Sequence, residues 1–108
     1  MKRDKAYLIG VDIGTKGTKA AVFDEGMRML GTGFRPSNLI SPEPGVVWQE
    51  PLEMLEECCQ AIREAVEQSG IDPTLVAAVG LDGQMAGIMG IDRDGEASTC
   101  YDSWLDMR

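Results

Sequence analysis

The chain has 108 residues, a formal net charge of −8, 44% hydrophobic residues and three cysteines. These values are typical of a globular chain with one domain at most and a small hydrophobic core. The acidic balance argues against a nucleic-acid backbone or an anionic membrane surface as the main partner, because both attract lysine and arginine. The sequence has no histidine and no Cys-x-x-Cys pair, which argues against a zinc site.

The cysteines favour a reducing compartment. Cys58 and Cys59 are adjacent and Cys100 is distant, so they do not form the spaced framework of a small secreted domain. The apolar stretch behind the basic N-terminus is interrupted at Asp12, too early for a signal peptide or a membrane span. We therefore expect a cytoplasmic protein with neither nucleic acid nor membrane as a partner.

The first part of the chain predicts an antiparallel meander of three strands. Residues 6–14 are apolar on both faces, as in a strand inside a sheet. Residues 18–24 predict a second strand, residues 24–27 a turn, and residues 28–35 a returning third strand.

A loop and a helix follow. Residues 35–51 hold four of the five prolines and predict an ordered loop. Pro51 suits the first turn of a helix, and Gly70 suits its end. Apolar residues at spacings of three and four predict the buried face of this helix: Leu52, Leu55, Cys59, Ile62 and Val66.

The last third predicts a strand and a hairpin. Residues 74–83 form another apolar run, which ends in a glycine-flanked aspartate, and residues 87–99 predict a hairpin that turns at Asp94 and Gly95. A strand after a crossover helix pairs in parallel through a right-handed connection. The expected fold class is therefore α/β, with a mixed sheet of three antiparallel strands followed by a helix and a parallel strand.

The stretch GVDIGTKGTKAAVFD, residues 10–24, is the strongest functional signal. It lacks both common glycine-rich nucleotide signatures, and a strand follows it instead of a helix. A strand-turn-strand can still bind an anion, because glycines let backbone N–H groups approach it closely. The candidate groups are the glycines at 10, 14 and 17, the hydroxyls of Thr15 and Thr18, and the charge of Lys16 or Lys19.

Asp12, at the end of the strand, is the candidate magnesium ligand. Mg²⁺ keeps part of its hydration shell and takes one or two carboxylates, so the contact would run through water. Together these groups describe the phosphate side of an ATP site. The alternative is an ordinary hairpin in which glycines serve the turn and Asp12 caps it.

The same stretch resembles the first phosphate motif of the actin, sugar-kinase and heat-shock-chaperone ATPase superfamily, whose domains have a ribonuclease-H-like fold. Three further stretches, GVVWQEPLEML, VAAVGLDGQMAGIMGIDRDG and YDSWLDMR, resemble those of the FGGY carbohydrate kinases in the same order. The resemblance covers Tyr7 to Arg108, and within the family it points to xylulose kinases.

The resemblance implies roles for individual residues. Asp12 would be the metal-associated carboxylate, and Gly14, Thr15 and Lys19 would contact the ATP phosphates. The sugar-contacting turn would be formed by Gln84, Met85 and Ala86, and the segment that closes over the sugar would include Trp104 and Asp106.

Each of these sugar-site assignments has a structural alternative. Met85 could fill a gap in the core, and Trp104 could cover apolar surface. Asp106 could form an ion pair with Arg108. Xylulose kinases usually have histidine where this sequence has Ala86, which leaves the identity of the sugar open.

The resemblance also implies that parts of the enzyme lie elsewhere. The general base of the family is an aspartate found much later than Arg108, and the adenosine-binding half is a second domain. Residues 1–108 are therefore interpreted as the N-terminal part of the first kinase domain, with no catalytic base and no activity on their own. A trypsin-like cleavage after Arg108 is one explanation for this length.

The expected function of the parent enzyme is ATP- and Mg²⁺-dependent phosphorylation of a small sugar or polyol, xylulose-like in class. A homodimer of that enzyme stays an open alternative. Two other functions are considered: an ATPase of a chaperone-like or actin-like branch, and a short non-enzymatic interaction protein.

Overall fold

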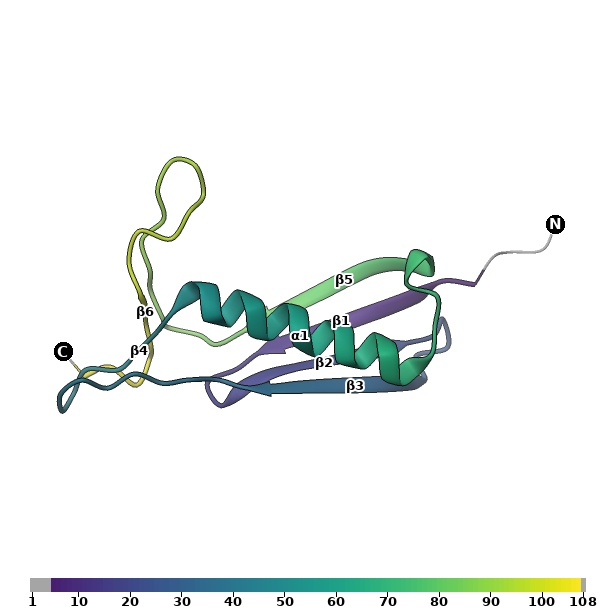
Figure 1. Ribbon diagram of the computed structural model, residues 1–108, viewed down its shortest axis with the longest axis horizontal. Coiled ribbons are helices and arrows are strands. Elements are labelled where there is room, and N and C mark those ends of the chain that lie inside the picture. The colour runs from purple at the N-terminus through teal and green to yellow at the C-terminus, as the bar shows by residue number, and fades with distance from the viewer. Residues whose placement is uncertain (1–4, 108) are drawn as a thin grey trace.

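The computed structural model describes residues 5–107. A four-stranded sheet forms the body of the molecule, with the strand order β3-β2-β1-β5. The strands are β1 (Tyr7–Ile13), β2 (Gly17–Phe23), β3 (Met29–Pro36) and β5 (Val76–Gly83). The first three pair antiparallel, and β5 pairs in parallel with β1. The predicted meander and parallel strand are confirmed (Figure 1).

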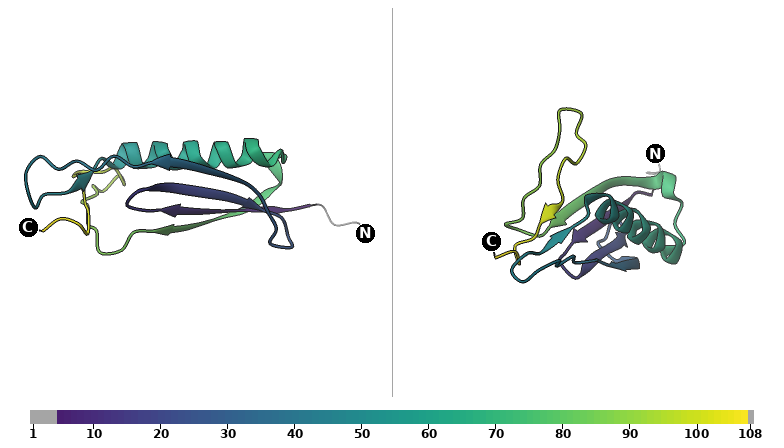
Figure 2. Two further views of the ribbon diagram at one scale, coloured as in Figure 1. Left: turned by 90° about the horizontal axis from the view of Figure 1, so that it is seen from below. Right: turned by 60° about the vertical axis from the view of Figure 1, so that its left-hand side comes forward.

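Helix α1 (Pro51–Ser69) covers one face of this sheet and packs on β2 and β3 (Figure 2). Its ends match the prediction. Pro51 occupies the first turn, the Glu50 side chain accepts from the Leu52 N–H, and Gly70 ends the helix at φ 70°, a left-handed conformation that glycine adopts without strain. A short 3₁₀ helix, η1 (Pro73–Leu75), leads into β5.

The remaining elements gather at the end of the sheet to which β1 and β5 point (Figure 1). There β4 (Trp48–Gln49) pairs antiparallel with β6 (Tyr101–Asp102). Between β5 and β6, a long loop projects from the body and is closed by the isolated bridges Ile88↔Asp102 and Ile91↔Ala97. Gly95 has φ 82° at its tip, so the predicted turn is confirmed.

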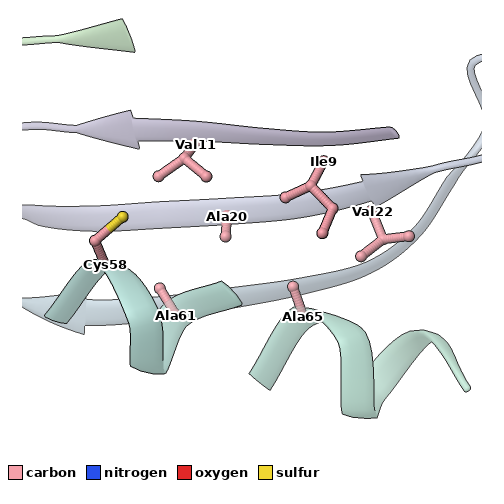
Figure 3. Close-up of a cluster of buried hydrophobic side chains, with 7 residues drawn as sticks. All are labelled: Ile9, Val11, Ala20, Val22, Cys58, Ala61 and Ala65. Atoms are coloured by element: carbon pink, nitrogen blue, oxygen red, sulfur yellow. The ribbon is translucent and has the colours of Figure 1, made fainter. Parts of the chain in front are cut away.

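The core lies between the sheet and α1. Figure 3 shows the buried side chains of both layers pointing toward one another: Ile9, Val11, Ala20, Val22, Cys58, Ala61 and Ala65. The helix contributes only small side chains to this cluster. Burial raises the pKa of the Cys58 thiol, and neighbouring Cys59 adds to the rise.

The predicted buried face of the helix is wrong in part. Leu52, Leu55 and Cys59 are exposed, while Ile62 and Val66 pack at the margin of the core. The reason lies on β3, where Gly31 and Gly33 face the helix without side chains. A Cβ at Gly31 would lie 2.6 Å from the Ala65 carbonyl oxygen, so the helix backbone rests almost directly on the strand. Only small helix residues fit into that contact, which rotates the leucines away from it.

None of the helices in residues 5–107 is both long and apolar enough to cross a membrane.

Glu57 gives a pH-dependent prediction. Burial raises the pKa of its carboxyl, the hydrogen bond from Ser37 opposes this rise, and Glu53 adds to it. The pKa of Glu57 is therefore higher in the folded state than in the unfolded state. Glu57 contributes to stability at pH values below its unfolded pKa, and this contribution is lost as the pH rises through its folded pKa.

We therefore expect Glu57→Gln, which retains an oxygen acceptor for Ser37, to raise the melting temperature at pH 7 and not near pH 4. The gain should be below about 1 kcal/mol because the carboxyl is only half-buried. Thermal melts at both pH values test this, with Glu67→Gln on the same helix as the control. An equal gain at both pH values would contradict the assignment.

Candidate functional site

A cavity of about 460 Å³ opens at the carboxyl ends of β1 and β5. One wall is the turn between β1 and β2, and the other is the segment that follows β5. The structure thus brings together most of the predicted site residues, with Gly83 added. The lining residues are Asp12, Gly14, Thr15, Gly83, Gln84, Met85, Ala86 and Trp104.

The turn between β1 and β2 is held tightly. The Gly14 N–H donates to the Gly17 carbonyl at 2.9 Å, and the Lys16 carbonyl accepts from the Ser37 N–H at 2.9 Å. Gly17 serves packing, since a Cβ there would collide with the Arg35 carbonyl and the Phe34 ring. Thr18 is fully buried, so its hydroxyl does not face the cavity as the sequence suggested. Thr15 therefore carries the hydroxyl of this turn.

Thr15 connects the two walls through its hydroxyl. The Trp104 Nε1–H donates to Thr15 Oγ1 at 2.8 Å, and Thr15 Oγ1 donates to Gln84 Oε1 at 3.3 Å. The Gln84 backbone N–H also donates to the Ile13 carbonyl at 3.0 Å. Residues 89 positions apart in sequence thus meet at one hydroxyl.

Met85 and Trp104 are both more exposed than purely structural roles in the core or over apolar surface would require. Met85 is 82% exposed, so it does not fill a gap in the described core. Trp104 is 54% exposed and uses its indole N–H for the contact with Thr15, so it does more than cover apolar surface. Both side chains stand at the cavity with surface available for a ligand.

Ala86 has φ 61°, an uncommon conformation for a residue with a Cβ. The next residue, Gly87, lies directly against the Tyr101 hydroxyl, where a Cβ would collide with the phenol. Burial raises the pKa of the Tyr101 phenol. The segment after β5 is thus bent by local backbone geometry and packed onto β6, which points it into the cavity.

Asp12 stands at the junction of this cavity and the sheet face opposite α1. Its cross-strand partner on β2 is Lys19, and its partner on the parallel strand β5 is Asp82. All three line a larger cavity of about 690 Å³ against the sheet. Lys19 is therefore beside Asp12 but does not line the cavity of Gly14 and Thr15.

Asp106 lies outside the cavity lining. Its carboxylate accepts the Val47 N–H at 3.0 Å, and the neighbouring Met107 N–H donates to the Gly45 carbonyl at 2.7 Å. Asp106 thus ties the Trp104 segment to the loop before α1. The alternative of an ion pair with Arg108 lies outside the described residues.

Sequence reasoning missed two residues of this region. The sequence marks Asp82 only as the end of a strand, although the parallel pairing of β5 with β1 predicts that it meets Asp12. Gln49 is 1% exposed and its Oε1 accepts from Gln84 Nε2 at 2.8 Å. Nothing in the sequence near Gln49 signals this contact, because it joins segments 35 residues apart.

Residues 7–108 match the N-terminal domain of the FGGY family of carbohydrate kinases. The chain belongs to this family. This membership confirms the resemblance and argues against a chaperone-like or actin-like branch.

Curated relatives agree with the family. The chain is 32% identical over 88 residues to a glycerol kinase of Rhizobium meliloti (strain 1021), covering 82% of this chain and 18% of that protein. It is 32% identical over 103 residues to a xylulose kinase of Haemophilus influenzae, covering 91% of this chain and 21% of that protein. The chain thus spans about a fifth of the length of these relatives.

Solved sugar kinases share the fold. A xylulose kinase from Brucella ovis superimposes with a TM-score of 0.88 at 27% identity, covering 94% of this chain and 22% of that one. A gluconate kinase from Lactobacillus acidophilus gives a TM-score of 0.85 at 25% identity, covering 95% and 20%. The predicted fold class, that of the sugar-kinase and actin-like ATPases, is confirmed.

Proposed function

We propose that a protein carrying this chain transfers the γ-phosphoryl group of ATP to a hydroxyl of a small sugar or polyol. The observation that carries the proposal is that the turn between β1 and β2 and the segment Gln84–Ala86 line the same cavity. A phosphate donor and an acceptor hydroxyl have to meet in this way, since phosphoryl transfer depends mainly on positioning and electrostatics. The family supplies the reaction class.

The turn is the proposed phosphate site. Gly14 has no side chain and lets a ligand approach the turn, Thr15 lines the cavity beside it, and Lys19 supplies positive charge beside Asp12. The proposed Mg²⁺ site is Asp12, with Asp82 as its neighbour. Two adjacent exposed carboxylates suit this ion, which prefers oxygen ligands and keeps several waters. When bound, Mg²⁺ supplies charge neutralisation at the transferring phosphoryl group.

The opposite wall is the proposed acceptor site. The Gln84 amide, the Met85 side chain and the Trp104 ring form a surface that is partly apolar and partly hydrogen-bonding, which suits a sugar or polyol. Asp106 keeps Trp104 in place through Val47 rather than contacting the acceptor itself. Both xylulose and glycerol kinases are relatives, and we favour a xylulose-like acceptor.

The rest of the machinery is assigned to sequence outside residues 1–108. We propose that these residues form the N-terminal part of the first kinase domain, since relatives are about five times longer. The general base and the adenosine site belong to that remainder. We place the protein in the cytoplasm, where ATP is available, and leave a homodimer as a further proposal.

The proposal is tested with the protein as its gene encodes it. ADP release is measured with D-xylulose, L-xylulose, gluconate and glycerol, and sugar-dependent release with at least one of them is expected. The 108-residue chain alone is expected to show none. A reading frame that ends at Arg108, or turnover by the short chain, would contradict the proposal.

Ala86 gives a prediction for acceptor preference. Histidine is among the residues that tolerate positive φ, so Ala86→His fits the backbone at φ 61°. The imidazole adds a hydrogen-bonding group to the cavity. Whether such a group finds a partner on the acceptor changes the preference between two acceptors by roughly ten- to a hundredfold.

We expect Ala86→His to shift the kcat/KM ratio toward D-xylulose and to leave the KM for ATP nearly unchanged. Steady-state kinetics with D-xylulose and the preferred acceptor measure this shift. Ala86→Asn, which suits the same φ with a shorter side chain, is the control. A changed ATP constant with an unchanged acceptor ratio would show that position 86 does not face the acceptor.

A further inference from the structure

Gln49 is a buried polar side chain whose position needs an explanation. It lies in the two-residue strand β4, opposite Tyr101 of β6, and is 1% exposed. Its Nε2 has no hydrogen-bond partner among the described residues. A buried amide group without a partner destabilises a fold, and an apolar residue of similar size would avoid that cost. The presence of glutamine at this position therefore indicates that the hydrogen bond accepted by its side-chain oxygen matters.

That oxygen is the last acceptor of a directed chain of hydrogen bonds. The indole N–H of Trp104 can only donate, so Thr15 Oγ1 accepts it at 2.8 Å. Thr15 then donates to Gln84 Oε1 at 3.3 Å, which leaves the Gln84 NH₂ group to donate to Gln49 Oε1 at 2.8 Å. Gln49 Oε1 thus accepts from the end of the Gln84 amide that Thr15 leaves free, and this contact ties the Gln84 side chain to a buried position.

The chain of hydrogen bonds crosses all the segments that build the cavity. Thr15 belongs to the turn after β1, Gln84 to the segment after β5, and Trp104 to the segment after β6. Of the four side chains, only that of Gln49 is buried, and it does not line the cavity. Because Gln49 is buried, it is suited to hold the other three side chains, which are more exposed, in one arrangement.

We infer that Gln49 is a positioning residue for phosphoryl transfer. By fixing the amide of Gln84 it holds Thr15 on the phosphate side and Trp104 on the acceptor side in one geometry before substrates bind. The effect on turnover rests on the proposed function, whereas the hydrogen-bond chain itself can be measured without any substrate.

The first measurement follows the indole N–H of Trp104 by NMR in full-length protein labelled at tryptophan, with Trp104→Phe to assign the signal. Gln49→Met retains the length of the side chain and removes the acceptor. We expect solvent exchange of the Trp104 indole proton to become about fivefold faster, as for the loss of one neutral hydrogen bond. Gln49→Glu, which retains an oxygen toward Gln84, should restore slow exchange.

The second measurement is a double-mutant cycle on kcat/KM for the acceptor. Gln49→Met and Thr15→Val should each lower it about tenfold, and the double variant should lose little more than either, because both interrupt the same chain. Gln68→Met provides the matched control. Gln68 accepts the Thr32 N–H at the other end of the helix, so neither exchange nor kinetics should change.

The outcomes separate this inference from the proposed function. Faster indole exchange in a protein without kinase activity supports the chain of contacts and contradicts the function. Unchanged exchange and additive kinetic losses in a folded, active Gln49→Met protein overturn the inference alone. If Gln49→Met does not fold, Gln84→Met removes the same contact from a half-buried position, and unchanged Trp104 exchange in that variant overturns the inference as well.

Discussion

Asp12→Asn is expected to lower kcat of the full-length enzyme by about two to three orders of magnitude, the range for removal of a group that stabilises charge in a transition state. The melting temperature should change by less than about 2 °C, because surface substitutions usually cost below 0.5 kcal/mol. This separation between activity and stability is the signature of a metal-associated carboxylate at Asp12.

The structure supports this separation. Asp12 is exposed at the end of β1, and its neighbours in the sheet are Lys19 and Asp82. Asparagine has the same shape, so the strand pairing with β2 and β5 is retained. What changes is the charge available to Mg²⁺, whose affinity depends strongly on the carboxylate.

Steady-state kinetics over a range of Mg²⁺ concentrations would measure the effect, together with a thermal melt. Part of the lost activity should return at high Mg²⁺, and Asp82→Asn should show a smaller loss of the same kind. Asp92→Asn, in the projecting loop, is the matched control and should behave as wild type. An Asp12→Asn protein that melts well below wild type but keeps its specific activity would support the hairpin alternative instead.

Local patterns in the sequence predict most of this fold. The apolar runs around Ile9 and Val79 predict β1 and β5, although β5 is exposed along most of its length, and Pro51 and Gly70 mark the ends of α1 within one residue. These signals are local because strand alternation, helix capping and turn chemistry act over a few residues. The meander and the parallel strand then follow from connection rules.

Features that depend on contact between distant segments were not predictable in the same way. The largest apolar residues of α1 predict its buried face, but Gly31 and Gly33 of β3 decide that Ala61 and Ala65 make the contact. Asp82 and Gln49 join the site only because β5 pairs with β1 and β4 lies beside Gln84. Periodicity within one segment carries no information on such partners.

Gly33→Ala is expected to destabilise the domain by about 3 kcal/mol or more, at the upper end of what overpacking costs. A Cβ at this position would collide with the Ala61 carbonyl oxygen and lie 3.0 Å from the Ala65 nitrogen. Both atoms belong to the helix backbone, which cannot move aside as a flexible side chain would. Helix α1 would have to lift from β3, and that movement would open the core at Cys58, Ala61 and Ala65.

Amide hydrogen exchange of α1, together with a thermal melt, would measure this loss, and the helix amides should lose protection before those of β1 and β2. Gly80→Ala is the matched control, since Gly80 also lies in a strand but, apart from its own chain neighbours, no atom of the described chain is within 4 Å of its Cβ position. That variant should melt within a few degrees of wild type. If Gly33→Ala keeps full protection of the α1 amides, the close contact between helix and sheet does not determine which helix face is buried, and some other contact must turn Leu52 and Leu55 toward solvent.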